Sequence, residues 1–201
     1  MNLTGKIAIA AAAVVAFSGS AMAADLYVPP AAPAAPVVTT TNWDGPYVGA
    51  TVGYSWYNSA TLGAANGWDI GAQLGYNFHV SDAIVLGLQG DVNWISTSYP
   101  TNPSGWNGAI VARLGYDAGA MLPYVEAGVA FADINFPAGG GLGAPGAQSS
   151  AGWTAGAGIE FMLADQWSVN VEYRYADYGS FGGGVGDIND NSIRVGLNYH
   201  F

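Results

Sequence analysis

Two histidines, His79 and His200, are the residues in this sequence best suited to acid–base chemistry. A serine nucleophile needs a general base, which in proteins is most often a histidine. Both histidines fall on the polar face of strand-like segments near the same end of the predicted sheet. The alternation brings no nucleophile and acid together around either one. We therefore predict that both histidines are polar residues that fill one end of the interior enclosed by the sheet. We predict no catalytic residues and no enzyme activity.

Metal and phosphate sites lack their usual residues. The sequence has no cysteine, and two histidines alone do not form a dedicated transition-metal site. Glycine runs at 139–146 and 182–187 lack the lysine and the strand, loop and helix setting of a phosphate-binding loop. The acids Asp177, Asp187 and Asp190 lack the spacing of a calcium-binding loop, so we interpret them as solvated loop charges. The sequence predicts neither a metal nor a cofactor.

Charged groups on the polar face of the segments are more informative. Arg113 and Glu126 flank one short turn and should face each other, with Glu160 on the next strand. A second group of charges lies farther along the strands. Unpaired charges are costly in the narrow interior of an eight-stranded barrel, so these groups predict a hydrogen-bonded ionic plug. The plug residues are Arg113, Glu126, Glu160, Glu172, Arg174 and Arg194.

Eight segments with a period of two must position these groups. In the second segment, Trp68, Ile70 and Leu74 share one face, while Asp69 and Gln73 share the other. A soluble sandwich or a lipocalin-like barrel would carry a polar coat rich in lysine and glutamate, but this polar face is mostly Gly, Asn, Gln and Ser. The bulky apolar face therefore predicts an all-β, antiparallel transmembrane barrel with lipid outside and a narrow lumen inside. The segments are 45–56, 68–80, 83–94, 105–116, 122–131, 152–161, 167–175 and 194–201.

The breaks between the segments alternate in length. Those near 57–67, 97–105, 133–151 and 177–191 are long, and those near 81–83, 117–121 and 163–166 are short. Outer-membrane barrels have short periplasmic turns and long outside loops, which predicts four extracellular loops and two periplasmic termini.

Aromatic residues gather at the two ends of the strands and predict two girdles, one at each membrane interface. The long-loop end has Trp56, Trp68, Trp94, Trp106 and Trp153, and the other end has Trp43, Trp167, Tyr116, Phe161, Tyr199 and Phe201.

The start of the chain is typical of a secreted protein. Lys6, the apolar run that follows it and two small residues predict a signal peptide at 1–23, too short to span a membrane as a helix. A linker rich in Pro and Ala is predicted at 24–41, and the barrel at 42–201. Without Lys6, three arginines stand against fourteen acids, and this net charge of −11 excludes nucleic acid as a partner.

The last strand carries a recognisable pattern. Arg194, Gly196, Tyr199 and Phe201 resemble the C-terminal assembly signal of outer-membrane barrels, in which a polar residue and a Gly precede two aromatics. The resemblance implies recognition by the barrel-assembly machinery and by periplasmic chaperones. The phrases NWDGPYVGATVGYSW, LPYVEAGVAF and VEYRYADYG are similar to the small porin-like or outer-membrane immunogenic proteins. The fold of that family is the eight-stranded OmpA/OmpX-type barrel of the Gram-negative outer membrane.

These features predict a non-enzymatic outer-membrane protein with a structural and surface-exposed role, surrounded by outer-membrane lipids and lipopolysaccharide. Two alternatives stay open. One is an adhesin or a receptor for a ligand such as haem, acting through the loops at 57–67 and 133–151. The other is a narrow passive channel, although the bulky inward side chains favour a lumen that is closed to solutes.

Overall fold

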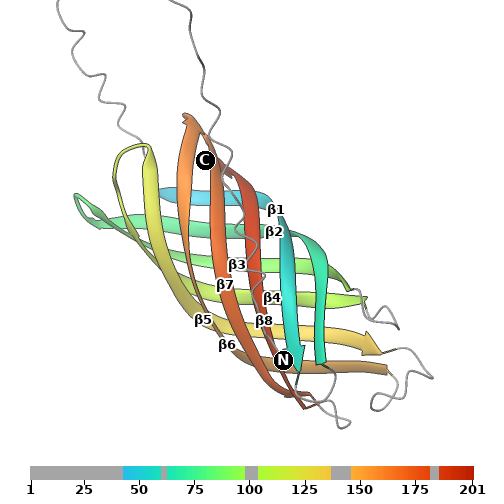
Figure 1. Cartoon of the computed structure of the whole chain (residues 1–201). Coiled ribbons are helices and arrows are strands. Elements are labelled where there is room, and N and C mark those ends of the chain that lie inside the picture. Colours follow the sequence, from blue (N-terminus) through green and yellow to red (C-terminus); the bar gives the residue numbers. More distant parts are fainter. Residues whose placement is uncertain (1–42, 60–62, 98–103, 137–145, 182–185) are drawn as a thin grey trace, which may run out of the picture. The chain divides into compact units, whose positions relative to one another are not determined.

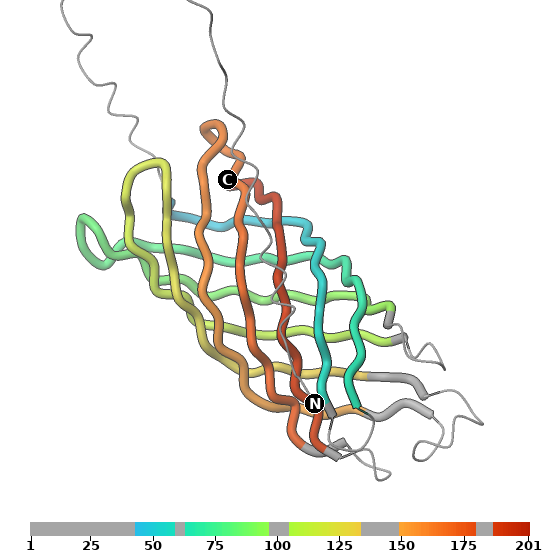
Figure 2. The backbone as a smooth tube through the Cα atoms, viewed as in Figure 1, coloured from blue at the N-terminus to red at the C-terminus, as the bar shows by residue number. Residues whose placement is uncertain are grey.

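The computed structural model describes residues 43–59, 63–97, 104–136, 146–181 and 186–201. They form eight antiparallel strands in one closed barrel (Figure 1), which confirms the predicted fold class. Each strand pairs with its neighbours in sequence, and β8 returns to pair with β1, as the tube in Figure 2 shows. The strands are β1 Gly45–Ser59, β2 Gly63–Ser81, β3 Ile84–Thr97, β4 Ser104–Tyr116, β5 Met121–Phe136, β6 Gly146–Ala164, β7 Trp167–Phe181 and β8 Gly186–His200.

Two predicted segments cannot be compared with this fold. The signal peptide at 1–23 and the linker at 24–41 lie outside the described residues. Within the described part of the chain, no helix is long and apolar enough to cross a membrane.

The outward and inward faces of the barrel follow from the alternation of side chains along each strand. In β2, the outward side chains of Ile70 and Leu74 are about two-thirds exposed, whereas the inward side chains of Asp69, Gln73 and Asn77 are buried. The apolar face therefore points outward, away from the lumen of the barrel. This arrangement is the reverse of a soluble barrel, whose apolar side chains fill the interior.

The two ends of the barrel differ. Short turns at 82–83, 117–120 and 165–166 define one end, named here the turn end, where the C-terminus also lies. The opposite loop end carries the connections at 60–62, 98–103, 137–145 and 182–185, which lie outside the described residues.

The strands extend farther toward the loop end than the sequence predicted. The long break expected at 57–67 is mostly strand, because β1 continues to Ser59 and β2 begins at Gly63. Likewise β8 begins at Gly186, not at Arg194. These extensions contain small and polar residues that resemble a loop in sequence, but backbone pairing continues through them. The pairing stays in register between β1 and its two neighbours, and it has one irregularity between Asp177 and Ser180, where β7 pairs with β8.

Four layers of inward side chains fill the barrel between its ends. Beginning at the turn end, they are a cluster around Trp43, a polar layer around Arg113, a second ionic layer around Arg174 and Arg194, and an apolar cap that includes Tyr57 and Tyr178. Eight strands enclose a space that side chains can fill completely, which explains why the interior is a packed core.

Candidate functional site

The Arg113 layer joins one arginine to one glutamate near the turn end. Arg113 Nη2 lies 3.0 Å from Glu160 Oε2, and both side chains are buried. The other carboxylate oxygen of Glu160 accepts hydrogen bonds from Ser168 Oγ and Asn198 Nδ2. A buried ion pair is stable only when its remaining hydrogen-bonding groups are also satisfied, and these donors satisfy the carboxylate.

Two tyrosines hold the Arg113 guanidinium in place. Arg113 Nη1 donates a 2.7 Å hydrogen bond to the Tyr47 hydroxyl, and the Arg113 Cζ atom lies 3.8 Å from the ring centre of Tyr124. Each ring lies over a glycine on the neighbouring strand, because a Cβ at Gly75 or Gly158 would approach the tyrosine Cζ to 2.4 or 2.6 Å. The absence of a side chain at these two glycines makes room for the rings.

Arg113 and Glu126 face each other across β4 and β5 as predicted, but they do not form an ion pair. The two residues are cross-strand neighbours in the register of β4 and β5, but the Glu126 carboxylate accepts a 2.8 Å hydrogen bond from Arg174 Nε on β7. Arg113 instead reaches β6. Long side chains in so narrow a lumen can extend across it, so contact follows their reach and not strand adjacency alone.

The Arg174–Arg194 layer contains two arginines that share carboxylates. Asp91 lies between them, 2.5 Å from Arg174 Nη1 through one oxygen and 3.4 Å from Arg194 Nη1 through the other. Glu172 contacts the same two arginines at 3.2 and 4.0 Å. Asp69 lies 3.6 Å from Arg194 Nε. All of these side chains are buried, so the layer is a desolvated ionic network.

Tyr124 connects the two polar layers. Its ring contacts Arg113, and its hydroxyl donates a 3.0 Å hydrogen bond to Glu172 Oε2. Asn170 Nδ2 donates to the same hydroxyl. The six predicted plug residues therefore belong to one connected network, although they pair differently from the prediction.

Three lumen acids were absent from the predicted plug. Asp69 and Asp91 contact the arginines directly. Asp190 was interpreted as a solvated loop charge, which is wrong, because it is 1% exposed and lies near the Ser55 hydroxyl inside the barrel. Asp190 has an even number, like the inward residues Ser192 and Arg194 of the same strand. The alternation along the strand therefore indicated that Asp190 points into the lumen.

An apolar cap closes the lumen toward the loop end. Tyr57, Ile95, Tyr178 and Ile188 are at most 6% exposed and pack in one cluster with inward alanines of β2, β4, β5 and β7. This cap was not predicted, because the segments that carry it were interpreted as breaks between strands.

Trp43 closes the lumen at the turn end, and its predicted place in an aromatic girdle is wrong. Its side chain is fully buried against Val85 and Leu122, and its indole nitrogen donates a 3.0 Å hydrogen bond to the Gly119 carbonyl. The next residue is held as well. Asp44 Oδ1 lies 2.8 Å from His79 Nδ1, so the chain that enters β1 is fixed against the turns.

The two histidines lie in different settings. His79 lies at the rim between Asp44 and Asp117, 2.8 and 3.1 Å from their carboxylates, and is only part-buried. His200 is buried inside, where its Nε2 atom lies 2.9 Å from Ser168 Oγ and 3.3 Å from Glu160 Oε1. The sequence did not predict this meeting of serine, histidine and glutamate.

The Ser168, His200 and Glu160 group differs from a catalytic triad in two respects. A triad acid binds the histidine nitrogen that faces away from the serine. Here Ser168 and Glu160 both lie at Nε2, and His200 Nδ1 has no hydrogen-bond partner among the described residues. All three side chains are at most 4% exposed below the Trp43 cluster, so a substrate has no approach to Ser168. In the described ranges, no three His, Asp or Glu residues are arranged to hold a metal ion.

The outward face carries aromatic side chains toward both ends. Edge-to-face pairs join Trp94 to Trp106 on neighbouring strands near the loop end, and Trp167 to Tyr199 at the turn end. The six predicted girdle tryptophans all point outward and are between 40% and 65% exposed: Trp56, Trp68, Trp94, Trp106, Trp153 and Trp167.

The predicted assembly signal lies on β8 and divides between the two faces. Arg194 and Gly196 point into the lumen, whereas Tyr199 and Phe201 point outward with their ring centres 5.1 Å apart. The Phe201 amide donates a 3.1 Å hydrogen bond to the Pro46 carbonyl, so the last residue is tied to the start of β1.

Comparison with known proteins agrees with this architecture. A family model, the outer membrane protein beta-barrel domain, matches residues 9–201. The chain belongs to this family. Among its relatives, the 25 kDa outer-membrane immunogenic protein of Brucella ovis is 35% identical, with each chain covered in full. The 22 kDa outer membrane protein of Rhizobium leguminosarum bv. viciae is 32% identical over 83% of this chain and 82% of its own.

Solved structures of other outer-membrane barrels share the fold. Neisserial surface protein A superposes with a TM-score of 0.64 at 18% identity, covering 78% of this chain and 97% of its own. Ail, the attachment invasion locus protein of Yersinia pestis, superposes with a TM-score of 0.58 at 13% identity, covering 79% and 99%. The protein is therefore an outer-membrane β-barrel related to the outer-membrane immunogenic proteins.

Proposed function

We propose that the protein is a closed, non-enzymatic barrel that reinforces the outer membrane and displays its loop end at the cell surface. The observation that carries this proposal is the filling of the lumen by four layers of buried side chains. A solute would have to displace Trp43, two ionic layers and the apolar cap. The geometry of Ser168, His200 and Glu160 also argues against hydrolysis in the lumen.

Conductance of the purified wild-type barrel in planar lipid bilayers tests the proposal. We expect no steady unitary currents, because the ionic layers leave no continuous path. Steady, large currents would defeat the proposal and make the narrow channel the leading function. Lysis-resistance assays on cells that lack the protein test the structural role, with greater sensitivity to detergent as the expected result.

Orientation is part of the proposal. The short turns and both termini face the periplasm and the four connections face outward, as is usual for barrels of this class. The natural chain has no cysteine, so single-cysteine variants give a clean readout. An impermeant maleimide added to intact cells should label Asn66→Cys near the loop end and not Asp82→Cys in a turn. The reverse labelling would overturn the orientation.

Partners follow from this placement. Lipopolysaccharide and other outer-membrane lipids surround the outward face, and the barrel-assembly machinery and periplasmic chaperones recognise the last strand during biogenesis. The Brucella relatives are named as immunogenic, which supports surface display of the loops. The alternative function is binding of an adhesion partner, or of a ligand such as haem, through the loops. Binding assays on the purified barrel distinguish this function from a purely structural role.

A further inference from the structure

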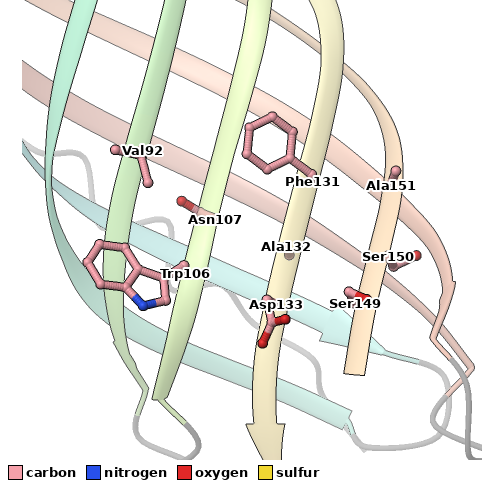
Figure 3. Close-up of a pocket in the computed structure, with 9 residues that line it drawn as sticks. All are labelled: Val92, Trp106, Asn107, Phe131, Ala132, Asp133, Ser149, Ser150 and Ala151. Carbon is pink, nitrogen blue, oxygen red and sulfur yellow. The ribbon is translucent and has the colours of Figure 1, made fainter. Parts of the chain in front are cut away.

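A groove of about 440 Å³ lies on the outward wall of the barrel across β3 to β6 (Figure 3). Its lining contains the rings of Trp106 and Phe131 and one carboxylate, that of Asp133. A single carboxylate in an apolar lining does not distinguish one class of ligand from another. Titratable side chains from three parts of the chain meet instead at the turn end, around His79.

His79 lies between two carboxylates that contact opposite nitrogens of its ring. Its Nδ1 atom lies 2.8 Å from Asp44 Oδ1, in the segment before β1, and its Nε2 atom lies 3.1 Å from Asp117 Oδ2, in the turn after β4. In the described ranges, these two acids are the charged groups that contact His79. The His79 side chain is 24% exposed, so its ring can exchange protons with solvent.

The two contacts require a charged imidazole ring. A carboxylate only accepts hydrogen bonds, and a neutral imidazole has a single N–H to donate. The ring nitrogens of His79 can therefore both donate only when the ring carries two protons. Histidine is the side chain whose charge ordinarily changes between about pH 5 and 8, so this pair of contacts depends on pH.

The same contacts close a ring of interactions around Trp43. The Trp43 indole nitrogen donates a 3.0 Å hydrogen bond to the Gly119 carbonyl, and the Gly119 amide donates a 2.7 Å hydrogen bond to Asp117 Oδ1. Asp117 contacts His79 through its other oxygen. His79 contacts Asp44, which is the chain neighbour of Trp43. His79 thus connects the segment that carries Trp43 to the turn that accepts its hydrogen bond.

Loss of one proton from His79 breaks this ring at a defined place. Asp44 Oδ1 also accepts a 2.7 Å hydrogen bond from the backbone amide of His79, which does not titrate. A neutral ring would keep its one proton on Nδ1 for Asp44 and turn a lone pair on Nε2 toward Asp117. The contact with Asp117 is therefore the one that opens. The turn that holds the Trp43 indole then loses its side-chain contact with β2.

We propose that His79, Asp44 and Asp117 form a proton-dependent latch that holds Trp43 in the turn-end mouth of the lumen. The latch is closed at acidic pH, where the His79 ring carries two protons. Its contribution to stability is present there and is lost as the pH rises and the ring gives up one proton. The inference goes beyond the proposed function, because it does not depend on which end of the barrel faces the periplasm.

Hydrogen exchange at the Trp43 indole N–H tests the latch. The refolded barrel without a histidine tag is compared with His79→Gln, which removes the titrating ring, and with Asp82→Asn, which removes an exposed charge from the neighbouring turn. The measured quantity is the protection factor relative to free tryptophan at the same pH. In the wild type we expect protection to fall at least about tenfold between about pH 5.5 and about pH 8.5, because a hydrogen bond between charged groups is lost. Asp82→Asn should behave like the wild type, and His79→Gln should show little change with pH.

Two results would overturn the proposal. One is the same pH dependence in His79→Gln as in the wild type. The other is loss of the pH dependence in Asp82→Asn, because the overall charge of the turns would then explain it.

A second measurement uses the wild type alone, so it decides the matter if a variant does not fold. The chain has two histidines, and the ¹⁵N chemical shifts of their ring nitrogens report protonation separately for each. We expect His79 to carry two protons at about pH 5.5 and to titrate together with the protection of the indole. A neutral His79 ring at that pH would contradict the latch.

Discussion

The ring of Tyr47 lies directly over Gly75, its cross-strand partner on β2. The same relationship holds between Tyr124 and Gly158 on β5 and β6. The two tyrosines contact Arg113, one through its hydroxyl and the other through its ring face. Two glycines thus determine where the aromatic rings lie, and the rings determine where the only arginine of the turn-end layer points.

Replacing Gly75 with alanine should displace Tyr47. The new Cβ would lie about 2.4 Å from the ring, so the ring must move and its hydrogen bonds with Arg113 and Gln89 are weakened. We expect the free energy of unfolding, measured by urea titration in lipid vesicles, to fall by about 1–3 kcal/mol. Gly90→Ala is the control, because the nearest atom to its Cβ lies 3.9 Å away. Equal losses of stability in the two variants would show that the contact with the Tyr47 ring does not cause the loss.

Removing the Arg113 side chain should leave the Glu160 carboxylate buried without its counter-charge. Arg113→Ala is expected to lower the free energy of unfolding by about 3–5 kcal/mol. Adding Glu160→Gln removes the unpaired charge and should restore at least about 1 kcal/mol. Urea titration of the wild type, both single variants and the double variant measures the coupling. Additive effects would mean that the 3.0 Å ion pair contributes little.

Strand alternation was sufficient to predict the fold. A period of two fixes which residues face inward, and the bulk of the outward set distinguishes a membrane barrel from a soluble one. The odd or even number of a residue within its strand, its parity, also indicated two inward side chains that the prediction placed elsewhere. Trp43 has the same parity as the inward residue Tyr47, and Tyr178 has that of Arg174, yet proximity to a strand end suggested a girdle for the first and a loop for the second.

Ion pairing inside the barrel could not be derived in the same way. Parity places Glu126 in the lumen, but its partner depends on how far arginines on other strands reach across the space. That reach is set by packing with neighbours such as Tyr124, which a linear sequence does not specify.

The terminal aromatics should be needed for assembly more than for stability. Phe201 is 72% exposed, and Tyr199 packs against it and Trp167 on the outward face. Changing Tyr199 and Phe201 to serine is expected to lower the yield in the outer-membrane fraction several-fold while the signal peptide is still cleaved. Immunoblots of fractionated cells measure both. Tyr76→Ser, at an outward tyrosine that is 56% exposed, is the control. Normal assembly of the double variant would refute the assembly role.

Trp43 should stabilise the barrel far more than a tryptophan on its outer surface at the same end. Its side chain is fully buried among Val85, Leu122 and the His200 ring, so Trp43→Ala leaves a cavity and breaks the hydrogen bond to the Gly119 carbonyl. Truncating a buried tryptophan costs about 3–5 kcal/mol. Trp167 is 44% exposed on the outward face, so Trp167→Ala removes the same number of atoms and should cost much less.

Urea titration compares the stability of the two variants. Planar-bilayer recording of Trp43→Ala should still show no current, because the Arg113 layer lies behind Trp43 in the lumen. Equal stability losses would mean that Trp43 is not part of the packed interior, and steady current through Trp43→Ala would mean that the ionic layers do not close the lumen by themselves.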